Sequence, residues 1–248
     1  MKSISITQDE KKIDTASLHV VQDIFTAQMK YPQDVHFGSI WCPPHGYHIR
    51  AAEAMYPLAY YAIHNNNNEY TQSAIHLANW LSARQEPEGY WIDPVTEENT
   101  TVFQLLALAC TFPFIKDSLG MLDTSGLTES MVKACAWCIK KVSIKKVSYA
   151  YGISFALALL FVAEELGNDA YVRKARSITR YIAKKVPFPG FSAQIHQHEL
   201  VRYTCAVYTA LVLNTSDTTI DTENACILPT VYRAYRQAWM YQYNQGEC

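Results

Sequence analysis

The feature that most constrains the fold of this chain is a pair of helices that recurs about every 50 residues. Clusters of Pro, Gly and Asn separate stretches in which apolar residues recur every three or four positions, which is the period of an amphipathic helix. Strand signals are few. The punctuation predicts helices over 15–30, 49–64, 69–84, 100–116, 126–143, 149–166, 169–185, 200–214 and 226–243.

These helices alternate in character along the chain. Every second one is apolar nearly all round, as in AEAMYPLAYYAI, FQLLALACTF, YGISFALALLF and YTCAVYTALVL. Those between them, such as EYTQSAIHLANWLSAR and AYVRKARSITRYIAKK, carry one apolar stripe and one charged face. A helix that is apolar on every side must be buried, whereas a helix with one stripe covers it from outside. We therefore expect inner and outer helices to alternate.

The register is clearest across two hairpins. A shift of 101 residues places one outer helix on another with the same spacing of large and small residues: Tyr70 on Tyr171, Ala74 on Ala175, Leu77 on Ile178, Trp80 on Tyr181 and Gly89 on Gly190. Each hairpin can bury its apolar face only against its neighbours. The sequence thus predicts an all-α fold, an (α/α) toroid or partial toroid of about four to five hairpins, with an open superhelix as the alternative.

The predicted domain organisation is simple. Residues 1–14 are polar and are expected to form a flexible N-terminal segment, and 15–248 a single helical domain that could belong to a longer protein. The connections from each outer helix to the next inner one are long and aromatic, whereas the opposite turns, NNNN and GND, are brief. Long connections on one face of a repeat array usually carry the binding site.

Four residues occupy equivalent positions where the inner helices begin: His48, Glu98, Tyr149 and Glu199. All four can exchange protons or form hydrogen bonds beside the unpaired N–H groups of a helix N-terminus. They are candidate catalytic groups. The alternative for the two glutamates is that they only complement the helix dipole in the first turn.

One turn further along the inner helices, a second set of polar residues recurs: Glu53, Gln104, Ser154 and Thr204. A carboxylate within RAAEAMYPLAYY is costly to bury without a partner or a task. Glu53 is therefore a catalytic candidate, and an ion pair with Arg50 is the alternative explanation.

Aromatic residues in the long connections predict a ligand site, because aromatic faces stack on the apolar faces of sugar rings. The alternative is that these residues close the core. Charged residues on the same face, Arg50, Asp93, Lys145 and Arg202, favour a ligand site. The predicted substrate-binding residues are Trp41, Tyr47, Arg50, Trp91, Gln104, Tyr151, Arg202 and Tyr203.

Metal binding is not predicted. Cys42, His45 and His48 have a spacing compatible with three ligands, but no fourth ligand is evident, and His196 and His198 allow a metal without requiring one. No cofactor is expected. The Cys135 and Cys138 pair lies within a helical stretch, where the two thiols are expected to pack as small apolar groups.

Composition limits the partners that the chain can attract as a whole. The formal net charge is −2, so no global field attracts nucleic acid or an anionic membrane, and a polyanion would need a local basic site. No run reaches the ~18 apolar residues of a membrane span. The N-terminus lacks the pattern of a signal peptide, so we expect a cytoplasmic chain unless a leader was removed. The sequence leaves the oligomeric state open.

The chain resembles the helical-toroid superfamily of carbohydrate-active proteins, which contains six-hairpin glycosidases and toroid polysaccharide lyases. The resemblance rests on the hairpin period, on the EGYWID loop after an outer helix ending ANWLSARQ, and on the HIRAAEAMYP start of an inner helix. It implies an enzyme that processes an oligosaccharide or polysaccharide at the toroid mouth. Whether the glycan is acidic is left open, and six hairpins would need about 300 residues at this period.

Two chemistries fit this expectation. Glycoside hydrolysis needs two carboxylates across the cleft, for which Glu53, Asp93, Glu98 and Glu199 are candidates. Elimination from a uronic acid instead needs a base. The candidates for that role are His48, His198 and Tyr149, with Arg50 or Arg202 facing the substrate carboxylate.

A non-catalytic carbohydrate-binding or scaffolding domain remains the alternative to an enzyme. It would use the same aromatic and polar residues without turnover.

Overall fold

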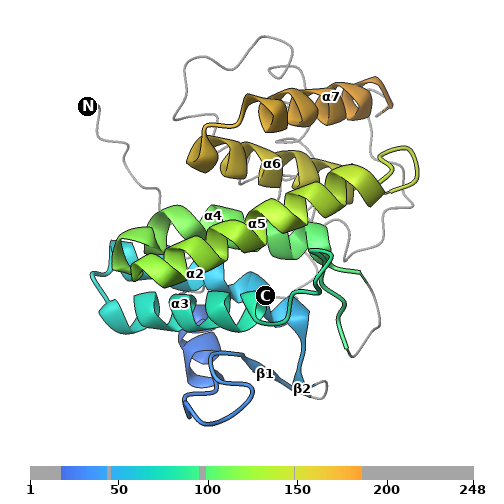
Figure 1. The fold of residues 1–248 in the computed structure, drawn as a ribbon. Helices are drawn as coiled ribbons and strands as arrows, with labels where there is room; N and C mark the ends of the chain where they lie inside the picture. Colours follow the sequence, from blue (N-terminus) through green and yellow to red (C-terminus); the bar gives the residue numbers. More distant parts are fainter. Residues whose placement is uncertain (1–17, 44–45, 95–98, 148, 186–248) are drawn as a thin grey trace, which may run out of the picture. The chain divides into compact units, whose positions relative to one another are not determined.

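The computed structural model of the chain describes residues 18–43, 46–94, 99–147 and 149–185 (Figure 1). These residues are mostly helical with few strands, which confirms the all-α class. The chain divides into two compact units, Met1–Trp137 and Cys138–Cys248, and each is described by itself. The predicted single domain over 15–248 and the toroid both stay predictions.

The first unit begins with a helix over 18–26 and a long connection that contains the short strands β1 (Trp41–Cys42) and β2 (Gly46–Tyr47). The remaining elements follow in order: the 3-10 helix η1 (Ile49–Ala54), α2 (Met55–His64), α3 (Asn68–Ser82), α4 (Thr101–Ile115), the 3-10 turn η2 (Lys116–Ser118) and α5 (Met121–Lys141). The last four residues of α5 belong to the second unit.

The second unit contains α6 (Tyr149–Leu166) and α7 (Asp169–Lys185), packed against each other as an antiparallel hairpin (Figure 1). Both helices match their predicted bounds. The predicted helix over 49–64 is also found, although its first six residues are 3-10. By contrast, α5 begins five residues earlier than expected, because the helix continues through Gly126, which meets open space and does not interrupt it. The helices predicted over 200–214 and 226–243 lie outside the described residues.

Burial separates inner from outer helices as predicted. In α4, buried residues occur on every side of the helix, from Thr101 to Ile115. In α3, burial follows one stripe that includes Tyr70, Ala74, Leu77 and Trp80. The charged face of such an outer helix stays in solvent, so each hairpin pairs a fully apolar helix with an amphipathic one.

The 101-residue register also appears in the structure. Ala74 and Ala175 are both fully buried, and Leu77 and Ile178 are buried at the corresponding next turn. The register extends to the caps, because Asn67 and Asn168 each accept a hydrogen bond from the backbone two residues on. An asparagine therefore ends each brief turn and starts the following outer helix in the same way.

A glutamine clamp recurs in the two long connections of the first unit, with Gln28 buried and Gln85 partly buried. The Gln28 side-chain amide donates to the carbonyl oxygens of Gly38 and Ser73, at 2.8 and 2.9 Å. The Gln85 amide donates to those of Gly89 and Ser130, at 3.1 and 2.9 Å. Each glutamine thus ties its own connection to the next outer helix, which is α3 in the first case and α5 in the second.

Each clamped glycine also approaches a helix backbone closely. Gly38 and Gly89 have φ of +86° and +97°, which favour glycine. A Cβ at Gly38 would lie 2.4 Å from the His76 carbonyl oxygen, and one at Gly89 would lie 2.5 Å from that of Lys133. The connection can therefore lie directly on the outer helix only because these positions lack a side chain. No helix among the described residues is long and apolar enough to cross a membrane.

Replacement of Gly89 by alanine is expected to lower the free energy of unfolding by about 2 kcal/mol or more, because strain at positive φ adds to the contact with the α5 backbone. Gly126→Ala is the matched control. It meets open space within a helix, so a gain of about 0.5–1 kcal/mol is expected. Urea unfolding measures both, and equal effects of the two changes would contradict the close approach.

Candidate functional site

The first long connection ends in a strand pair that delivers His48 to the start of an inner helix. β1 and β2 are antiparallel, with Trp41 opposite Tyr47 and Cys42 opposite Gly46. His48 follows directly and is the N-cap residue of η1, although its side chain makes no capping bond. The second connection repeats this arrangement with a bridge between Ile92 and Asn99.

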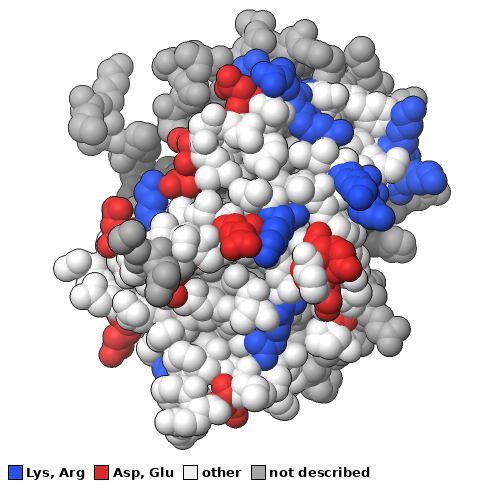
Figure 2. Space-filling model, viewed as in Figure 1, with Lys and Arg blue, Asp and Glu red and all other residues white. Residues whose placement is uncertain are grey.

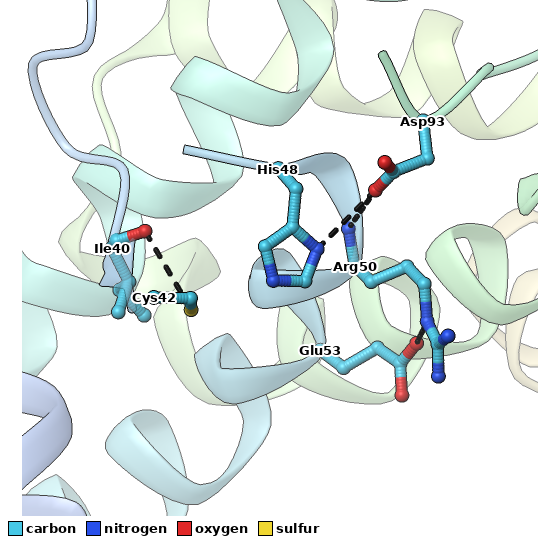
Figure 3. A network of polar contacts seen from close by, with 6 residues as sticks. All are labelled: Ile40, Cys42, His48, Arg50, Glu53 and Asp93. Carbon is cyan, nitrogen blue, oxygen red and sulfur yellow. Dashed lines mark hydrogen bonds and ion pairs between the residues drawn. The ribbon is translucent and has the colours of Figure 1, made fainter. Parts of the chain in front are cut away.

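Asp93 follows that second bridge and reaches the start of η1. Its side chain has no exposed surface. Its Oδ2 lies 3.3 Å from His48 Nδ1 and accepts a hydrogen bond from the Arg50 backbone N–H, also at 3.3 Å (Figure 3). Two connections that are 45 residues apart therefore meet at one carboxylate. The sequence named both His48 and Asp93 as candidates but not their pairing.

The buried carboxylate orients the His48 ring. A carboxylate accepts hydrogen bonds, so the Nδ1 that faces Asp93 is the donating nitrogen and Nε2 is the acceptor of the neutral ring. The His48 side chain is 19% exposed. An imidazole held in one tautomer by a buried acid, with a partly accessible ring, has the arrangement of a general base.

Arg50 and Glu53 lie one turn along the same helix. Arg50 Nε is 3.9 Å from Glu53 Oε1, at the outer limit of an ion pair, and both side chains are about one-third exposed. The ion pair that the sequence offered as an alternative to catalysis is therefore present but long. It leaves Glu53 Oε1 buried without a hydrogen-bond partner.

Gln104 of α4 lies beside Glu53. It is fully buried, and neither atom of its side-chain amide has a hydrogen-bond partner in the described structure. Burial raises the pKa of Glu53, while the Arg50 charge and the nearby Gln104 amide partly offset that rise. Buried polar atoms of Glu53 and Gln104 that have no hydrogen-bond partner therefore lie close together.

An aromatic patch stands beside His48 on the strand pair. Trp41 is 48% exposed, and its ring meets that of Tyr47 edge-on at 5.1 Å. His36 stacks on the other side of Tyr47 at 4.2 Å, a contact that no sequence signal indicated. Trp41 and Tyr47 therefore lie where the sequence expected a sugar-stacking surface.

Trp91 offers no accessible face on which a sugar ring could stack. It has no exposed surface, and its indole N–H donates to the Leu81 carbonyl oxygen at 2.9 Å. The structure gives Trp91 a packing role, which is the alternative that the sequence left open. Trp91 is therefore not available for contact with a substrate.

The remaining candidates belong to the second unit or lie outside the described residues. Tyr151 is half-buried in α6 of the second unit, where Tyr149 is the first helical residue. Glu98, His198, Glu199, Arg202 and Tyr203 lie outside the described residues. The second inner helix has its N-cap at Thr100, two residues after Glu98. Among the described residues no group of three or more potential metal ligands comes together.

The two connections share a sequence motif that makes Asp93 equivalent to a residue of the first connection. GSIWCP and GYWIDP each begin with the clamped glycine and end in proline, so Cys42 and Asp93 occupy equivalent positions. Cys42 is a half-buried free thiol whose pKa is raised by burial. Of these two residues, Asp93 is the one that requires a partner, because a buried carboxylate is costly without one.

The fold and the site together define a helical-hairpin protein with a histidine–carboxylate pair between two long connections. The family model of the ulvan lyase N-terminal domain matches residues 18–190. The chain therefore belongs to this family, which is a carbohydrate-active family of a polysaccharide lyase. No curated protein and no solved structure matches the chain significantly.

Glu53→Gln tests the burial of this carboxyl. Because the folded-state pKa is raised from 4.5, the folded chain holds the proton more tightly than the unfolded chain, and stability falls as pH rises through the folded pKa. The glutamine variant should lack this fall and should be at least as stable as the parent at neutral pH. Urea unfolding between acid and neutral pH measures it.

If Glu53→Gln is less stable than the parent at neutral pH but not at pH 4, the attraction between Arg50 and the ionised Glu53 carboxylate outweighs the cost of burying that carboxylate. Glu88→Gln, at an exposed carboxylate in the second long connection, is the control and should change neither the level nor the slope.

Proposed function

We propose that the chain acts in polysaccharide elimination, cleaving next to a uronic acid at the site built from His48, Asp93 and Arg50. The observation that carries the proposal is the contact between His48 Nδ1 and the buried Asp93 carboxylate. The family supports lyase chemistry, and it gives no support to the expected alternative of hydrolysis.

The proposed reaction needs one base and no water. His48 Nε2 removes the proton on the carbon next to the uronate carboxyl group, and the electron pair forms a double bond to the neighbouring ring carbon. The bond from that carbon to the glycosidic oxygen breaks, and the leaving oxygen takes up the proton that His48 Nε2 has removed. Asp93 stabilises the imidazolium that forms on His48, as a buried acid does beside a catalytic histidine.

Arg50 is proposed to face the substrate carboxylate. Its side chain is partly exposed, and its contact with Glu53 is long enough to be exchanged for a substrate oxygen. Neutralising the carboxylate makes the neighbouring proton more acidic, because the negative charge that develops in the transition state is stabilised. The exposed rings of Trp41 and Tyr47 are proposed to stack on a neighbouring sugar.

Hydrolysis fits the site less well than elimination. It needs two accessible carboxyl groups across a cleft. Asp93 is fully buried and already accepts from His48 and Arg50, which leaves Glu53 as the partly exposed carboxyl of this cluster. The toroid closed by further hairpins, with this site at its mouth, belongs to the same proposal and rests on the alternation of inner and outer helices.

A non-catalytic carbohydrate-binding domain is the second candidate. The observation that favours it is the exposed Trp41 beside Tyr47, since such a patch binds a sugar ring whether or not the neighbouring histidine reacts.

His48→Ala should reduce elimination from ulvan or another uronate polymer by about 10²-fold or more, and Asp93→Asn by about 10²–10⁴-fold, because the first removes the base and the second its orienting acid. The assay follows the ultraviolet absorbance of the unsaturated uronate together with new reducing ends. His19→Ala, at an exposed histidine before the site, is the control and should keep full activity.

The products separate the candidates. Reducing ends without the absorbance would establish hydrolysis. Binding without turnover by the folded parent chain would establish the second candidate, and an active His48→Ala variant would remove His48 as the base.

A further inference from the structure

The positive charge of this chain is concentrated in one stretch, which the net charge conceals. Residues 138–185 contain ten of its 21 lysines and arginines but only three of its 23 acidic residues. The described part of the second unit is therefore strongly basic within a chain of net charge −2. This is the local basic site that a polyanion would need.

Four lysines cluster where α5 ends. Lys140 and Lys141 form its last turn, and Lys145 and Lys146 follow within the next five residues; all four are exposed. The Lys146 backbone N–H donates to the Ser143 carbonyl oxygen at 2.9 Å, which closes a tight turn and holds the two pairs near each other.

Helix α7 carries further basic residues, in its first half near the turn from α6 and therefore apart from the four lysines. Arg173 and Arg176 are exposed and three residues apart, so they lie on one face of the helix. Their side opposes the buried stripe of Ala175 and Ile178, so both guanidinium groups remain in solvent. Figure 2 shows blue side chains spread over α7 and the end of α5 on one face of the molecule.

Within the described part of this unit, the acidic residues lie at the end of the hairpin away from the four lysines. Glu164, Glu165 and Asp169 flank the turn between α6 and α7. Because the two helices are antiparallel, that turn is a full helix length, about 27 Å for α6, from the lysines that precede it. These carboxylates therefore lie near Arg173 and Arg176 and do not neutralise the four lysines.

We propose that this basic surface, made of Lys140, Lys141, Lys145 and Lys146, binds a linear sulfated or carboxylated polysaccharide. It is an attachment surface that does not require the His48 chemistry. Only the choice of a polysaccharide, rather than another polyanion, rests on the proposed function. Attraction of this kind raises the local concentration of a long chain and depends strongly on salt.

Two double variants of equal net charge test the surface. Lys145→Gln with Lys146→Gln removes two charges from it, whereas Lys30→Gln with Lys133→Gln removes two charges from the first unit. Binding of dextran sulfate is measured at several salt concentrations, with unsulfated dextran and a short DNA duplex as competing probes. Circular dichroism confirms that each variant is folded.

The first double variant should bind dextran sulfate about tenfold more weakly, with a salt dependence shallower by roughly one unit for each lysine removed, and the second should change affinity less than twofold. Equal effects of both variants, or equal binding of unsulfated dextran, would overturn the surface. Tighter binding of DNA than of dextran sulfate would replace the polysaccharide with nucleic acid as the partner.

His48→Ala separates this surface from the active site. The variant should keep full dextran sulfate binding. If it also keeps its lyase activity, the proposed base is wrong while the basic surface stands; if it loses dextran sulfate binding, the two sites are one and the surface is wrong.

Discussion

A glutamine side chain holds each long connection of the first unit against the outer helix that follows. Gln28 and Gln85 each bridge a loop glycine and a helix carbonyl, and each glycine lies too close to the helix for any side chain. The Gln28 bonds are buried and the Gln85 bonds are partly buried, so a lost partner would leave a polar group at least partly shielded from water without a hydrogen bond. The clamp therefore fixes the path of the connection, and the strand pair or bridge that follows it inherits that path.

The site depends on this path, because Asp93 comes four residues after the clamped Gly89. A fully buried carboxylate needs donors, and the start of η1 supplies the Arg50 backbone N–H and His48 Nδ1. The same interaction that stabilises the acid orients the histidine. Stability and the proposed catalytic geometry thus rest on one set of contacts, while Glu53 Oε1 and the Gln104 amide are buried without hydrogen-bond partners.

Much of the fold could be predicted from the sequence, because inner and outer helices differ in how many of their sides are apolar. The bounds of α6 and α7 and the span 49–64 followed from that contrast and its punctuation. The pairing of His48 with Asp93 could not be predicted, because periodicity says nothing about which loop residues meet across 45 positions. Trp91 and Trp41 looked alike as loop aromatics, and only packing places one in the core and leaves the other in solvent. The glutamine clamp could not be predicted, because the two glutamines are 57 residues apart and therefore do not align at the hairpin period of about 50 residues.

The central claim is that Asp93 holds neutral His48 with its proton on Nδ1, so that Nε2 is the base. Nitrogen-15 NMR of the labelled full chain tests it directly, with the His48 signals assigned by their loss in His48→Ala. The account predicts a protonated Nδ1 and an unprotonated Nε2 in the neutral ring, and a shift of this balance in Asp93→Asn. A neutral ring protonated on Nε2, or a balance that Asp93→Asn leaves unchanged, would contradict it.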